Sequence, residues 1–277
     1  MRVIPPLKLS LLSSNVAAAS EPSWGSGTSY SAGDRVVYDI VTPHVIYEAL
    51  RNTTGDIPPD SPADWVRVGS TNRWAMFDGI SQSVTERSTS IDVTVSLPDF
   101  ADRLALFNLQ ADSVRVVVRS GSTVISDTTF SNPGSTLVAA VSGLFLNLEL
   151  DVTISATTAR CGQLVAGKSR FLGLAQWGYS PDIIDFSRSE SDDFGNVQLV
   201  QRAFAQTLDV STFMPPSLVD KANRELTTLR AKPVAWDANN PDTDNDELRI
   251  FGWLEDSNVT IQSIAHAIAD MQIQELT

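Results

Sequence analysis

Three segments of this chain alternate apolar, mostly β-branched residues with polar ones at every second position. They are residues 90–97, 113–119 and 146–154. Successive side chains of a β-strand point to opposite faces, so this alternation indicates strands that are buried on one face. Turn-forming residues separate the strands, which predicts a β-sandwich or jelly roll over residues 71–160 rather than alternating strands and helices. Within it, residues 100–109 are ambiguous and fit a short helix as well.

Residues 161–277 predict a small α+β part. Its clearest helix follows Ser217, which can cap it, and the apolar positions that mark one helix face are Val219, Ala222, Leu226 and Leu229. Pro233 ends the helix. Residues 197–210, 234–236 and 248–254 predict strands, and residues 258–275 predict a further strand with a helix as the alternative. The polar residues 181–195 predict an exposed loop.

Charge and cysteine content exclude several classes of function. Thirty-three acidic residues against twenty basic ones give a net charge of −13, which opposes binding to nucleic acid or to an anionic membrane. Cys161 is the single cysteine, and His44 and His266 are the only histidines, so neither an intrachain disulfide nor a cysteine zinc site is expected. No segment reaches the roughly 18 consecutive apolar residues of a membrane span, so membrane insertion is not predicted.

The first 20 residues partly imitate a secretory signal. Basic residues come early and three alanines follow at 17–19, but Pro5, Pro6 and the polar residues 13–15 interrupt the apolar middle. We therefore expect no signal peptide. An extended N-terminal arm over residues 1–20, which gains its buried area on joining a partner subunit, is the better interpretation.

Acidic residues in two places raise the question of chemistry. The carboxylates of Asp242, Asp244 and Asp246 are spaced like the start of a calcium loop, but Glu247 and Trp253 occupy the positions where an EF-hand needs Gly and Glu. A solvated hairpin loop is the prediction there, with a calcium site as the alternative. The second group contains candidates for an acid and base pair in glycoside hydrolysis, namely Asp182, Asp185, Glu190, Asp192 and Asp193.

Carboxylates in a polar loop are mostly solvated, whereas a catalytic pair needs an environment that raises one pKa. The chain also lacks a phosphate-binding glycine loop, a nucleophile elbow and an HExxH zinc motif. No catalytic residue, cofactor or metal ligand is therefore predicted, and an enzyme is not expected.

Residues 21–70 contain a dense aromatic pattern with turn formers between short β-type runs. The pattern resembles the small chitin- and cellulose-binding modules of bacterial glycoside hydrolases. That resemblance implies a small β domain and gives as candidate glycan-binding residues Trp24, Tyr30, Tyr38, Tyr47 and Trp65. Residues 50–54 contain no tryptophan where the family has its exposed ones, so a docking or spacer module is favoured, with glycan binding as the alternative.

A wider resemblance rests on the start of the chain, MRVIPP, on the motif Asn72-Arg73-Trp74-Ala75-Met76-Phe77-Asp78, and on residues 193–204. These segments are similar to tail proteins of long-tailed, siphovirus-type bacteriophages of Gram-negative hosts, in which the second motif begins a galactose-binding-like β-sandwich. The resemblance implies a structural subunit of the tail tip or baseplate, made in the host cytoplasm and located in the virion. Its partners would be other tail proteins and further copies of itself. The alternative is a receptor-binding adhesin, a tail fibre or spike component, that binds a host surface polysaccharide.

Overall fold

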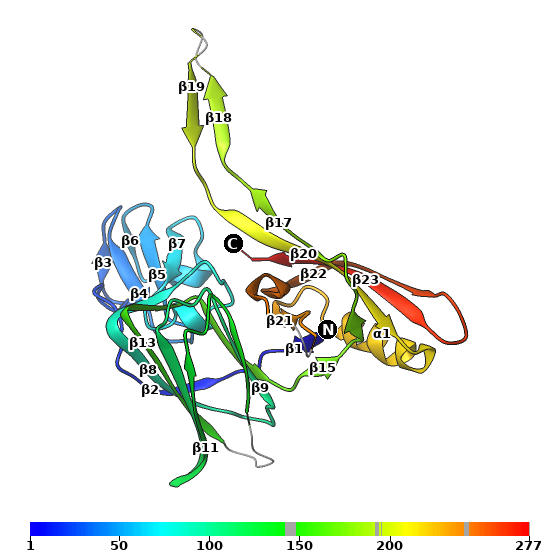
Figure 1. The fold of residues 1–277 in the computed structure, drawn as a ribbon. Helices are drawn as coiled ribbons and strands as arrows, with labels where there is room; N and C mark the ends of the chain where they lie inside the picture. Colours follow the sequence, from blue (N-terminus) through cyan, green and yellow to red (C-terminus); the bar gives the residue numbers. More distant parts are fainter. Residues whose placement is uncertain (142–147, 192–193, 195, 241–243, 277) are drawn as a thin grey trace.

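A computed structural model describes residues 1–141, 148–191, 194, 196–240 and 244–276 (Figure 1). The described chain is mainly β, with antiparallel strand pairs throughout its sheets and a single α-helix, which confirms the predicted class. The more specific predictions, a galactose-binding-like jelly roll and a carbohydrate-binding-module fold, stay predictions.

The aromatic N-terminal part forms two small sheets. One pairs β3 (Ser29–Tyr30) with β6 (Thr53–Thr54), and the other has the order β4 (Arg35–Tyr38), β5 (Val45–Ala49), β7 (Trp65–Ser70). The short 3-10 helix η1 (Pro58–Asp60) precedes β7. Four residues form the buried centre: Tyr30, Val36, Ala49 and Trp65. Aromatic rings supply most of the apolar area in so small a core.

Two further sheets share one hydrophobic core. The five-stranded sheet has the order β11 (Thr123–Ser131), β10 (Ser113–Ser120), β13 (Glu149–Cys161), β8 (Thr85–Ser96), β2 (Ser10–Ser14). The three-stranded sheet has the order β12 (Leu137–Ala140), β9 (Arg103–Phe107), β14 (Gln163–Gly167). The 3-10 helix η2 (Ala75–Phe77) lies within the sequence motif at residues 72–78 and contributes Met76 to the core. The predicted alternation is confirmed in β8, β10 and β13, although residues 146–147 lie outside the described residues.

Residues 103–107, inside the ambiguous segment, form the strand β9 and not a helix. This strand is buried on both faces. Leu104 and Leu106 belong to the core shared with the five-stranded sheet, whereas Ala105 and Phe107 belong to a second cluster with Phe251 on the other side. A strand covered on both faces loses the alternation by which a half-buried strand is recognised.

The C-terminal part is built on an eight-stranded sheet. Its order is β15 (Arg170–Phe171), β1 (Arg2–Ile4), β21 (Val234–Asp237), β22 (Arg249–Ile261), β23 (Ala267–Glu275), β20 (Phe204–Met214), β16 (Leu174–Ala175), and β17 (Ser180–Asp185) also pairs with β20. The 3-10 helix η4 (Asp246–Leu248) leads into β22. Residues 258–275 thus belong to strands β22 and β23 and to the turn between them, rather than to a helix.

Helix α1 (Val219–Thr228) packs on one face of this sheet with the four residues predicted from sequence, Val219, Ala222, Leu226 and Leu229. The predicted cap at Ser217 is wrong. A 3-10 turn, η3 (Pro216–Leu218), precedes the helix, and the N-cap residue is Leu218, whose side chain forms no capping hydrogen bond. The backbone N–H of Leu218 is donated instead to the carbonyl of Pro215.

Outside the aromatic N-terminal part, the described chain stacks four layers. Helix α1 covers one face of the eight-stranded sheet, the three-stranded sheet covers part of the other face through Ile4, Ala235 and Phe251, and the five-stranded sheet lies beyond it. Burial between these layers fixes their order, because each sheet hides an apolar face against the next.

The N-terminal segment joins two of these layers. Strand β1 lies between β15 and β21 in the eight-stranded sheet, and β2 forms an edge of the five-stranded sheet beside β8. Val3 and Ile4 are fully buried. The segment is extended, as expected, and its strands β1 and β2 pair with strands of the same chain.

Residues 181–185 and 188–191 are exposed, as predicted, but they form strands and not a loop. Strand β17 pairs with β20, and β18 (Arg188–Ser191) pairs with β19 (Val197–Val200). Between these two strand pairs, the backbone N–H of Phe186 donates a hydrogen bond to the carbonyl of Ala203, so the four strands form one long hairpin. Residues 192, 193 and 195 lie outside the described residues. The outer part of the hairpin, with β18 and β19, rises away from the rest of the molecule (Figure 1).

Candidate interaction surfaces

Two of the five candidate glycan-binding residues are core residues. Tyr30 and Trp65 are 8% and 2% exposed, and their rings meet edge to face with centroids 5.2 Å apart. The hydroxyl of Tyr30 accepts the N–H of Gly25 at 2.7 Å, and the indole N–H of Trp65 is donated to the carbonyl of Asp56 at 3.0 Å. Both rings are committed to packing, so neither can stack on a sugar.

The other three candidates form a half-buried row: Tyr38 lies on β4, Tyr47 lies on β5, and Trp24 comes from the segment before β3. The ring of Tyr38 lies between Trp24 and Tyr47, with centroids 5.9 Å and 6.4 Å away. The interplanar angles are 56° and 85°, so the three rings do not form one flat platform. The indole N–H of Trp24 is buried and finds no acceptor among the described residues. The row brings three predicted residues together, and glycan binding by them stays a prediction.

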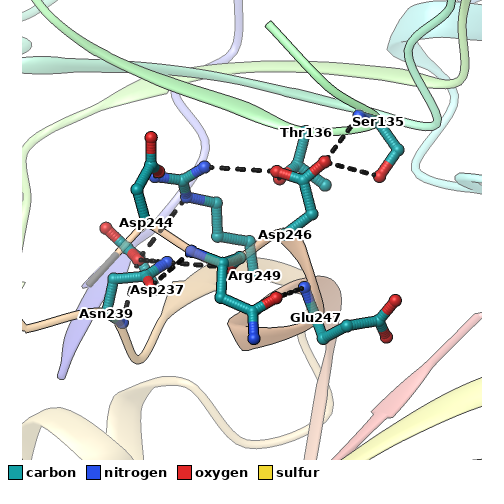
Figure 2. Close-up of polar contacts among 9 residues, drawn as sticks. Ser135, Thr136, Asp237, Asn239, Asp244, Asp246, Glu247 and Arg249 are labelled. Carbon is teal, nitrogen blue, oxygen red and sulfur yellow. Dashed lines mark hydrogen bonds and ion pairs between the residues drawn. The ribbon is translucent and has the colours of Figure 1, made fainter.

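A polar junction holds the eight-stranded sheet against the three-stranded one. The carboxylate of Asp246 accepts three hydrogen bonds: from the backbone N–H of Ser135 at 2.6 Å, from its hydroxyl at 3.0 Å and from the hydroxyl of Thr136 at 3.0 Å (Figure 2). Burial alone would raise the pKa of Asp246, but these hydrogen bonds outweigh it and lower that pKa below its usual value. Asp246 is therefore bound at the junction rather than solvated in a hairpin loop.

Arg249 is the cation of this junction. Its side chain is 12% exposed and lies within 4 Å of three carboxylates, those of Asp237 at 3.7 Å, Asp244 at 2.5 Å and Asp246 at 3.4 Å (Figure 2). Two carboxylates of the acidic cluster, those of Asp244 and Asp246, thus neutralise the nearly buried guanidinium of Arg249. Without such partners, a charge at that depth would be strongly destabilising. Asp242 and Thr243 lie outside the described residues, and the described residues contain no group of ligands that could hold a metal ion.

A second polar contact lies at the end of β23. Glu275 is 7% exposed and accepts from the hydroxyl of Ser81, from the amide of Gln82 at 3.1 Å and from the backbone N–H of Gln206 at 3.1 Å. Sequence reasoning missed Glu275, because no motif marks a glutamate whose partners lie far away in the chain.

The remaining titratable candidates have structural surroundings. Cys161 is fully buried, and desolvation raises the pKa of its thiol to about 12, so a reactive thiolate is not available. The ring of His44 packs beside that of Trp74 at a tilt of 40°, with centroids 5.0 Å apart, and burial lowers the pKa of His44. Asp185 lies exposed at the end of β17, where hydrogen bonds from Ser187 lower its pKa, the opposite of what a catalytic acid needs.

The hairpin of β17 to β20 exposes a set of large apolar side chains. Val197 and Leu199 are 63% and 78% exposed, and they lie on one face opposite Ser191 and Ser189. Further exposed apolar residues along the hairpin are Ile183, Ile184, Phe186 and Phe204. Strands β18 and β19 pair only with each other among the described strands. Sequence reasoning missed this surface because its apolar positions are scattered among serines and carboxylates.

Comparisons with protein-family models, with curated proteins and with solved structures found no match for this chain. None of the helices described is long and apolar enough to cross a membrane.

Proposed function

We propose that this chain is a structural subunit of the tail tip or baseplate of a tailed bacteriophage, and that it acts by assembling with other tail proteins without catalysis. The sequence motifs at residues 1–6, 72–78 and 193–204 supply the link to tail proteins. The structural observation that supports an assembly role is the exposed hairpin of β17 to β20.

A two-stranded ribbon is marginally stable in water on its own. Val197 and Leu199 leave most of their apolar surface in solvent, and each would stabilise a complex by roughly 1–2 kcal/mol if it were buried. Both outer edges of β18 and β19 also leave backbone groups available for pairing with another strand. A neighbouring subunit that covers the hairpin would bury these apolar side chains and pair with a free strand edge in the same contact.

The second candidate function is a receptor-binding adhesin. The half-buried row of Trp24, Tyr38 and Tyr47 favours it, because partly exposed aromatic rings offer apolar faces to the C–H groups of a sugar. Tyr30 and Trp65 play no part in this version.

The test of the assembly role replaces Val197 and Leu199 together by serine in the phage that encodes the chain. Gln198→Ser is the matched control, because this residue lies between them on the opposite face of the hairpin. We expect the double variant to melt like the wild type but to be missing from purified tails, whereas the control is incorporated normally. Wild-type incorporation of the double variant would contradict the hairpin's role, and absence of the wild-type chain from virions would contradict the tail location.

Phage particles that carry Trp24→Ala distinguish the adhesin function from the assembly role. Complete tails that no longer adsorb to the host would favour the adhesin, whereas complete tails that adsorb normally would leave the assembly role as the function.

A further inference from the structure

The outer face of helix α1 and the turn that follows it form a basic surface on an acidic protein. Lys221 and Arg224 point away from the sheet, and Arg230 and Lys232 follow; all four are exposed, and none forms an ion pair with a described residue. We call these four residues the basic helix face. Of the acidic residues on the helix, Glu225 is already paired with Arg170, and the exposed Asp220 offsets one of the four positive charges. The basic helix face therefore keeps its positive charge although the chain as a whole has a net charge of −13.

The face of the eight-stranded sheet that points away from helix α1 is acidic. Across β20, β23 and β22 one row of side chains is Asp209, Gln272 and Asp256, and the next row is Ser211, Asp270 and Asn258. Residues directly opposite each other in antiparallel strands share one face of the sheet. We call these two rows the acidic sheet face. They line a shallow hollow of about 290 Å³.

The acidic sheet face is the part of the sheet that the three-stranded sheet does not cover. Its neighbours in sequence, Val210, Ala269 and Met271, are buried in the same cluster as α1, so the acidic side chains point away from the helix. The three-stranded sheet packs further along, on Ile4, Ala235 and Phe251. Asp209, Asp256, Asp270 and Gln272 are all exposed.

Because the two charged faces lie on opposite sides of one sheet, they cannot meet within a single chain, but they can meet between two copies. We propose that the basic helix face of one copy docks on the acidic sheet face of a second copy of this chain. A helix of this length is about 15 Å long and about 10 Å wide. Three strands spaced about 4.8 Å apart form a surface of about the same width as the helix. Complementary charge selects this orientation, because the overall negative charge disfavours other contacts between copies.

A contact between two different faces of the same protein is head to tail, so repetition produces a closed ring or an open filament. This inference rests on the proposed assembly function and names one of its partners, a further copy of the chain. It uses side chains at the base of the hairpin, on β20, and on the neighbouring strands β22 and β23, and it does not include Val197 and Leu199 of the outer part. Charge pairs at such an exposed contact are screened by salt, so the association should weaken as ionic strength rises.

The experiment uses two charge-reversed variants of the full chain. The first carries Lys221→Glu and Arg224→Glu, and the second carries Asp209→Lys and Asp256→Lys. At the reversed positions, each variant alone would bring like charges together, while Arg230 and Lys232 keep their charge. When the two are mixed, the reversed positions of each variant meet opposite charge on the other, and the mean net charge equals that of the wild type. A variant with Asp60→Lys and Asp99→Lys, both exposed elsewhere, changes the net charge by the same amount as the second variant and controls for that change.

Sedimentation equilibrium at low ionic strength, up to about 1 mM protein, detects contacts worth roughly 4 kcal/mol. We expect concentration-dependent association of the wild type, of the Asp60 and Asp99 control and of the mixture, and monomers for each reversed variant alone. Thermal melts verify that the variants are folded. A wild type that stays monomeric, a reversed variant that still associates, or a folded mixture that does not recover would overturn the inference.

The same reversed variants separate this inference from the proposed function. If they enter tails normally, the contact between copies is not used in the virion and the tail role stands. If the wild-type chain is absent from virions while the mixture associates as expected, the self-association stands and the tail role fails.

Discussion

The carboxylate of Asp246 binds both the backbone N–H and the hydroxyl of Ser135, a residue 111 positions earlier in the chain. These contacts, with that to Thr136 and the pairing to Arg249, tie the eight-stranded sheet to the three-stranded one. The junction therefore adds a polar link to the apolar packing between these two sheets, and it can be tested by substitution.

Asp246→Ala should lower the free energy of unfolding by about 1–3 kcal/mol, because it leaves hydrogen-bond donors of Ser135 and Thr136 without their acceptor. Asp244→Ala is the matched control. It removes a carboxylate that also pairs with Arg249, but its side chain is 84% exposed, so a loss below about 1 kcal/mol is expected. Urea unfolding measures both. Equal losses for the two variants would show that the contacts to Ser135 and Thr136 contribute nothing.

The junction should also respond to acid. The pKa of Asp246 is lowered in the folded state, so its contribution to stability is present above the unfolded value of 3.8 and is lost as the pH falls through the lower folded value. The urea midpoint of the wild type should drop over this range by more than that of Asp246→Asn, which has no carboxylate to protonate. Parallel pH profiles for the two proteins would contradict this assignment.

Gly134→Ala should destabilise the junction from its other side. Gly134 has φ +79°, and a β-carbon there would lie against the carboxylate of Asp246. Gly121 has φ +58° with nothing within 4 Å of an added β-carbon, so Gly121→Ala reports the backbone cost alone, roughly 1–2 kcal/mol. We expect Gly134→Ala to cost more than Gly121→Ala in urea unfolding. A smaller or equal loss would mean that the Asp246 carboxylate moves aside freely.

Aromatic residues of the N-terminal part should separate into two classes. Trp65→Ala removes a buried ring and should cost about 3–5 kcal/mol, whereas Tyr38→Ala removes a half-buried ring and should cost clearly less. Hydrogen exchange over residues 21–70 follows the two variants. If Tyr38→Ala exposes the amides as strongly as Trp65→Ala does, the row of Trp24, Tyr38 and Tyr47 is core and cannot be a glycan surface.

Cys161 should react with thiol reagents at the rate of unfolding. Its sulfur is fully buried, and desolvation raises the pKa of the thiol to about 12, so both access and thiolate are lacking in the folded protein. Labelling at neutral pH should be slow in buffer and should accelerate with urea in parallel with the loss of structure. Fast labelling in buffer would show that the end of β13 opens locally.

The pattern of side chains along the chain was enough to predict the elements that are buried on one face. Strands β8, β10 and β13 alternate because one side faces a core and the other faces solvent, and α1 shows the same asymmetry at helical spacing. Strand β9 escaped recognition because layers cover both of its faces. The hairpin at residues 180–204 escaped recognition for the opposite reason, since its outer part is exposed on both faces and only backbone pairing defines it.

The sequence by itself thus determined the mainly β class, the helix face of α1 and the strongly acidic charge, because each is a local or additive property of the residues. Tertiary structure alone decided which aromatic rings are buried, where residues 1–14 pair, and that Asp246 meets Ser135. It also placed the basic helix face and the acidic sheet face on opposite sides of one sheet. These are relations between segments far apart in the chain, fixed by packing of layers that no single segment encodes.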